Sequence, residues 1–210
     1  MALIWEVGAV LNIASGVLIA ALGAALLVTD PRRVRNRVFG AFALFWGAQI
    51  VTINVVRVTP DAETARFAGE MSLAFLVPLY FFMLSFASIF PRPRPPFGTS
   101  SLAVALLALP AAVTLAILFA APDLLIEGVE RTATGAFTVH WGPLMPFLVT
   151  APFYGALFYA LFVFMRRLDE TGSPIERRQI SFVLAALALF LAYATPIQLA
   201  LFGGEALGLG

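Results

Sequence analysis

Six long apolar runs, separated by short polar connectors, make up most of the chain. About 20 mostly apolar residues are enough for a helix to cross the hydrocarbon core of a bilayer. Lipid offers no hydrogen bonds to the backbone, so such segments must be helical. We therefore expect an all-α, polytopic membrane bundle of six transmembrane helices in a single transmembrane domain, residues 1–210. The expected spans are residues 7–28, 38–56, 67–90, 102–120, 144–165 and 180–202, and Glu70 is the only charged residue within them.

Composition supports a membrane protein. Of the 210 residues, 61% are hydrophobic and only 12% are charged, with a mean hydropathy of +0.95. Soluble domains carry about 25% charged residues. The bilayer is therefore the main solvent of this chain.

The arginines predict the orientation. The connectors after the first, third and fifth spans hold ten arginines, whereas those after the second and fourth hold three. Basic residues favour the cytoplasmic side, so the N-terminus and the C-terminus are both expected outside. Two groups of four are expected to face cytoplasmic lipid headgroups: Arg32, Arg33, Arg35 and Arg37, and Arg166, Arg167, Arg177 and Arg178.

The longest connector, residues 121–143, is then an outer loop. Within it "AFTVHW" alternates between apolar and polar residues directly after Gly135. Such a pattern predicts a short strand or hairpin lying on the helix ends. The single histidine, His140, falls in this segment and is expected to be an ordinary loop residue.

Residue types exclude several kinds of chemistry. The chain has neither cysteine nor lysine, so it has no thiolate metal site, disulfide or Schiff-base lysine. No serine lies near the single histidine in the sequence, and no glycine-rich phosphate-binding loop is present. We expect no enzyme activity, no catalytic residue, no metal and no cofactor. The arginines are too few and too interrupted by acids for nucleic acid, so membrane lipids are the expected partners.

Polar side chains inside a membrane are costly and need an explanation. The strongest of them fall in the outer half of the spans and are candidate ligand-binding residues: Asn12, Gln49, Thr52, Asn54, Glu70, Tyr193 and Gln198. The alternative is hydrogen bonding between helices, worth about 0.6–2 kcal/mol per bond. Gln49 and Asn54 are five residues apart and do not share a helix face, which weighs against a single pocket. Glu70 is expected to pair with Arg57 or Arg66.

The first span carries Gly16, Ala20 and Ala24 at four-residue spacing. Small residues at this spacing let two helices approach closely. We interpret the stripe as helix packing.

Three segments carry a resemblance to a known family. They are "NRVFGAFALF" at residues 36–45, "ARFAGEMSLAFLVPLYFFMLSFASIFPRPR" at residues 65–94, and "SPIERRQISFVLAALAL" at residues 173–189. In this order they resemble the seven-helix N-terminal sensor region of bacterial and archaeal histidine kinases and related signalling proteins. The resemblance covers about residues 36–204. It implies a sensor or receptor module that binds a ligand in its outer half and relays to the cytoplasmic side.

The family has a seventh helix that returns the chain to the cytoplasm and leads to a signalling domain. Here six spans are expected before Gly210. We therefore expect a fragment of a longer signalling protein, or a module that depends on a partner. The alternatives are a small-solute or lipid transporter subunit and a structural membrane partner protein.

Overall fold

A computed structural model describes residues 2–30, 32–91, 101–132 and 135–206. Side chains are not described for residues 2–7, 101–104, 107, 190 and 193–206. The chain divides into two compact units, Met1–Ala156 and Leu157–Gly210, which are described separately.

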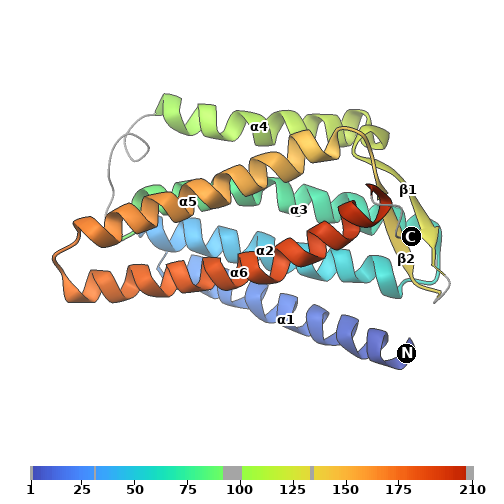
Figure 1. Cartoon of the computed structure of the whole chain (residues 1–210), viewed down its shortest axis with the longest axis horizontal. Coiled ribbons are helices and arrows are strands. Elements are labelled where there is room, and N and C mark those ends of the chain that lie inside the picture. The colour runs from blue at the N-terminus through green and yellow to red at the C-terminus, as the bar shows by residue number, and fades with distance from the viewer. Residues whose placement is uncertain (1, 31, 92–100, 133–134, 207–210) are drawn as a thin grey trace. The chain divides into compact units, whose positions relative to one another are not determined.

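Four long helices form most of the first unit (Figure 1): α1 (Ala2–Thr29), α2 (Val34–Val58), α3 (Ala62–Ile89) and α4 (Ser101–Ala120). Each helix contacts the next along the chain and runs antiparallel to it. Asp61 begins α3, because its carboxylate accepts a hydrogen bond from the backbone N–H of Thr64 at 2.7 Å. The bonds from the Thr64 backbone and side chain lower the pKa of Asp61.

The backbones of α1 and α2 touch at two levels. A Cβ atom built on Gly23 would lie 2.6 Å from the carbonyl oxygen of Gly40, and one on Gly16 would lie 2.8 Å from that of Gly47. Gly16 and Gly23 are seven residues apart, as are Gly40 and Gly47, so each pair occupies one helix face. The expected close approach at Gly16 is therefore present, and its partner helix is α2.

A β-hairpin covers one end of the first unit. Strands β1 (Ile126–Arg131) and β2 (Phe137–Trp141) pair antiparallel, and Gly135 between them has φ +86°. Phe137 packs into a core cluster with Val56 of α2 and with Ala65 and Ala68 of α3. We call this the hairpin end; it holds the N-terminus of α1, the C-terminus of α2 and the N-terminus of α3. A short helical turn, η1 (Pro122–Leu124), leads into the hairpin.

After the hairpin the chain forms one wide helical turn, η2 (Pro146–Thr150), which continues into α5 (Ala151–Glu170). The buried hydroxyl of Thr114 in α4 lies 2.9 Å from the carbonyl oxygen of Pro110 in its own helix and 3.1 Å from that of Leu148 in this turn, and its proton is shared between these two acceptors. The bond ties α4 to the start of α5. In the second unit α6 (Pro174–Ala206) follows a short turn, where Thr171 donates to Glu176 at 3.0 Å.

The architecture is a helical bundle, as expected, and the expected hairpin is present. Among the described residues, four helices are long and apolar enough to cross a membrane: Gly8–Thr29, Val34–Val58, Ala62–Ile89 and Pro146–Glu170. Ala108–Ala120 is a shorter apolar helix. Several helices begin earlier than their apolar runs. In particular α3 begins at Ala62 rather than residue 67, because Asp61 caps it, and α6 begins at Pro174, ahead of its apolar run at residue 180.

The glycine contact between α1 and α2 predicts that Gly47→Ala and Gly155→Ala, the same change in two helices, have different effects on the free energy of unfolding. The methyl group of Gly47→Ala would meet the carbonyl of Gly16 and the backbone of Ala20, so the helices must separate. Overpacking of this kind costs about 1–3 kcal/mol. The matched control is Gly155→Ala in α5, where no described atom lies within 4 Å. It should be neutral or stabilise by up to about 1 kcal/mol through helix propensity. Reversible unfolding in mixed micelles measures both, and equal effects would contradict the contact.

Candidate functional site

Asn12 and Asn54 join α1 to α2 near the hairpin end. The side-chain amide of Asn12 donates to the side-chain oxygen of Asn54 at 3.4 Å. Asn54 is buried, with 5% of its surface exposed, and its own amide donates to the carbonyl of Ile50 at 2.8 Å. Asn12 is exposed. The contact between the helices is therefore long, whereas the bond within α2 is short.

Gln49 makes the corresponding contact between α2 and α3. Its side-chain amide donates to the hydroxyl of Ser72 at 3.4 Å, and Ser72 is only 1% exposed. Thr52, one turn further along α2, donates to the carbonyls of Ala48 and Gln49 at 2.9 and 3.1 Å. These bonds of Thr52 stay within its own helix.

Glu70 belongs to an ion-pair group at the hairpin end. Arg66 donates to Glu70 at 3.1 Å, one turn apart on α3, and also contacts Asp123 of η1. The expected pairing of Glu70 with Arg66 is therefore present. Because the Arg66 side chain is 38% exposed, the group acts mainly by tying η1 to α3 rather than as a strong source of stability.

The hairpin adds one more titratable pair. His140 Nε2 lies 2.8 Å from a carboxylate oxygen of Glu130, across β1 and β2. The His140 side chain is 39% exposed and that of Glu130 is 71% exposed. His140 thus has a partner on the hairpin surface.

The structure separates the candidate residues into distinct contacts. Asn12 meets Asn54 between α1 and α2, Gln49 turns to α3, and among the described residues no hydrogen bond joins Gln49 to Asn54. The remaining candidates, Tyr193 and Gln198, lie in the part of α6 whose side chains are outside the described residues.

The expected topology arginines lie at helix ends. The first group surrounds the α1–α2 turn, and Arg33 pairs with Asp30 at 2.7 Å. Arg166 pairs with Glu170 at 2.8 Å, Arg167 lies in the last turn of α5, and Arg177 and Arg178 lie near the start of α6.

Two partners could not be assigned from sequence spacing. Ser72 holds Gln49, and Asp123 holds Arg66 from 57 residues away. Both contacts depend on the packing of elements distant in sequence. The available signal was that Ser72 is a polar residue inside a span, which requires a partner.

The polar side chains near the hairpin end between α1, α2 and α3 are neutral hydrogen-bonding groups. Asn12, Asn54 and Gln49 supply neutral amides, which both donate and accept. In the described part of the chain, no group of three potential metal-binding side chains is found.

Comparison with known proteins identifies the family. The family described as the N-terminal 7TM region of histidine kinase matches residues 11–204. The match begins earlier than the resemblance at Asn36 and includes most of α1. A search of the curated proteins finds no match. The matched region is a multi-pass membrane sensor module of signalling proteins and is not their catalytic domain. The chain belongs to the family of N-terminal 7TM regions of histidine kinases.

Proposed function

We propose that the chain senses a small ligand at the hairpin end and passes a movement of α3 to the opposite end of the first unit. In this proposal the hairpin end faces the outside of the cytoplasmic membrane. The arginine-rich turns then face the cytoplasm, where a signalling domain receives the movement.

The observation that carries the proposal is the length of the two bonds between helices. Asn12–Asn54 and Gln49–Ser72 both measure 3.4 Å, beyond the usual 2.7–3.2 Å range for N–H···O bonds. A ligand with its own donor and acceptor groups can replace such bonds at little cost. Tyr193 and Gln198 remain in the proposed set on the basis of the sequence.

The proposed moving element is α3. The backbones of α1 and α2 are in contact at the glycine pairs, so these helices are expected to move together. By contrast α3 contains Pro78, which removes one backbone hydrogen bond near its middle. It meets α2 through the long Gln49–Ser72 bond and through aromatic rings such as Phe45 and Phe82. A ligand that takes over Gln49 or Ser72 would therefore displace α3 relative to the α1–α2 pair.

Labelling of single cysteines tests the orientation, because the chain has no cysteine of its own. Glu127→Cys on β1 and Gly172→Cys in the α5–α6 turn are both exposed sites. In intact cells a membrane-impermeant maleimide should label Glu127→Cys, and it should label Gly172→Cys only after permeabilisation. The reverse pattern would overturn the orientation inferred from the arginines.

Spin labels test the relay. Labels at Arg35→Cys and Ser85→Cys report the separation of α2 and α3 far from the hairpin end. Gln49→Leu removes the bond to Ser72 and should shift or broaden this distance by about 1–2 Å, as expected for helix shifts. Thr52→Val is the matched control, since the hydroxyl it removes bonds only within α2.

Pulsed electron spin resonance in nanodiscs measures both distance distributions. If Gln49→Leu matches the unsubstituted chain, α3 is not the relay. That result leaves ligand binding at the hairpin end to be judged by binding assays. If Thr52→Val produces the same shift in the distance, the shift is a general response to the loss of a polar side chain from α2 and does not depend on the bond to Ser72.

A further inference from the structure

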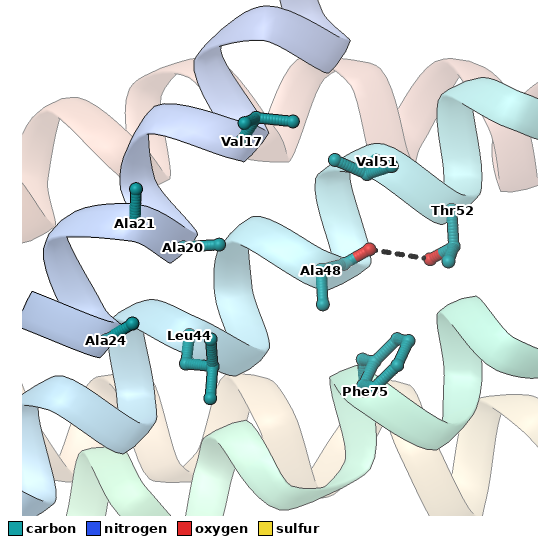
Figure 2. A pocket seen from close by; sticks show the side chains of 9 residues that line it. All are labelled: Val17, Ala20, Ala21, Ala24, Leu44, Ala48, Val51, Thr52 and Phe75. Carbon is teal, nitrogen blue, oxygen red and sulfur yellow. Dashed lines mark hydrogen bonds between the residues drawn. The ribbon is translucent and has the colours of Figure 1, made fainter. Parts of the chain in front are cut away.

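An apolar groove lies between α1 and α2. It has a volume of 460 Å³ and is closed on one side by Phe75 of α3 (Figure 2). Its other lining residues come from α1 (Val17, Ala20, Ala21 and Ala24) and from α2 (Leu44, Ala48, Val51 and Thr52). On each helix the lining residues fall on one face over about two turns, so the groove follows the helix axes. At a rise of about 1.5 Å per residue, Leu44 to Thr52 spans about 12 Å.

The groove offers almost no hydrogen bonding. Its single polar side chain is Thr52, whose hydroxyl donates to the carbonyl of Ala48 within the same helix. The lining lies inside three helices that are apolar and long enough to cross a membrane. The occupant must therefore be an elongated hydrocarbon rather than a polar ligand.

A basic residue lies in line with the groove at one end only. Arg37 is seven residues before Leu44, two helical turns away, and therefore on the same face of α2. It is exposed and forms no ion pair with any residue that the structure describes. At the other end, Arg57 is five residues beyond Thr52 and lies on a different face. The charge next to the groove thus favours an occupant with an anionic head at the Arg37 end.

We propose that this groove binds one acyl chain of an anionic phospholipid whose phosphate is held by Arg37. The distance from Arg37 to Thr52 along α2 is about 22 Å. Half of a bilayer including its headgroups is of similar thickness, about 20–22 Å. The alanines of α1 make room for the chain, and Phe75 supports its side. The groove includes Thr52, one of the candidate ligand-binding residues, but none of Asn12, Asn54, Gln49 and Ser72, which make the proposed ligand contacts.

Native mass spectrometry of the purified protein tests the site, with phosphatidylglycerol as the probe. One phosphatidylglycerol should be retained more tightly than phosphatidylcholine with the same chains. Ala21→Phe fills the groove and should weaken retention at least about tenfold, because a filled groove cannot hold the chain. Arg37→Gln should weaken it about fivefold, the effect expected for one basic residue near an anionic headgroup.

Two matched controls define the result. Ala25→Phe adds the same ring to an exposed alanine of α1 outside the groove lining, and Arg57→Gln removes an arginine from the other face. Neither should change retention. Equal retention by Ala21→Phe and Ala25→Phe would overturn the site. Equal losses of lipid retention in Arg37→Gln and Arg57→Gln would show that Arg37 attracts anionic lipid only through general charge, and would overturn its role at the groove.

Two further measurements complete the test. Melting temperatures show whether each variant is folded. If Ala21→Phe is unfolded, the difference in lipid retention between Arg37→Gln and Arg57→Gln decides whether the site exists. The oligomeric state is measured in parallel. If the protein is a dimer and only Ala21→Phe makes it dissociate, the groove binds a second copy of the chain, and the lipid proposal is overturned.

Discussion

The backbone contact between α1 and α2 determines much of the geometry of the first unit. Because Gly16 faces Gly47 and Gly23 faces Gly40, the two antiparallel helices have one register. That register places Asn12 opposite Asn54, closer to the hairpin end than the contact between Gly16 and Gly47. In lipid, helices gain no hydrophobic energy by associating, so close backbone packing is the main source of their attraction. The polar contact follows from the packing and adds little to it.

The same packing explains why polar groups at the hairpin end are weakly held. Asn54 and Thr52 satisfy themselves first within α2, through short bonds to backbone carbonyls. Only the remaining amide groups reach across to another helix, and they do so at 3.4 Å. A polar group in a membrane that has a partner in its own helix does not force two helices together. Under the proposed function, the ligand competes for these contacts between helices.

The helices could be predicted from the sequence because a single physical requirement, backbone hydrogen bonding in lipid, acts on each segment separately. The hairpin was predictable for a similar reason, since its alternation and Gly135 are local signals. The pairing of Glu70 with Arg66 is also local, one helical turn apart.

Contacts between distant elements could not be predicted in this way. The stripe at Gly16 indicated a close approach but not that Gly47 would meet it. The five-residue spacing of Gln49 and Asn54 indicated different faces, but not which neighbouring helix each face would meet. Phe137 in the core and Asp123 beside Arg66 depend on how the hairpin lies on α2 and α3. The contact between Thr114 of α4 and the carbonyl of Leu148 likewise joins elements that are distant in sequence.

The groove and the proposed relay meet at α3. Phe75 forms one side of the groove, and Ser72, which holds Gln49, is three residues before it on the same helix. An acyl chain in the groove would pack against Phe75 and favour the position of α3 that it contacts. A ligand that displaces α3 at Ser72 would then weaken the lipid, and by linkage the lipid would weaken the ligand by the same factor. Under the two proposals together, the composition of the membrane therefore sets the threshold at which the sensor responds.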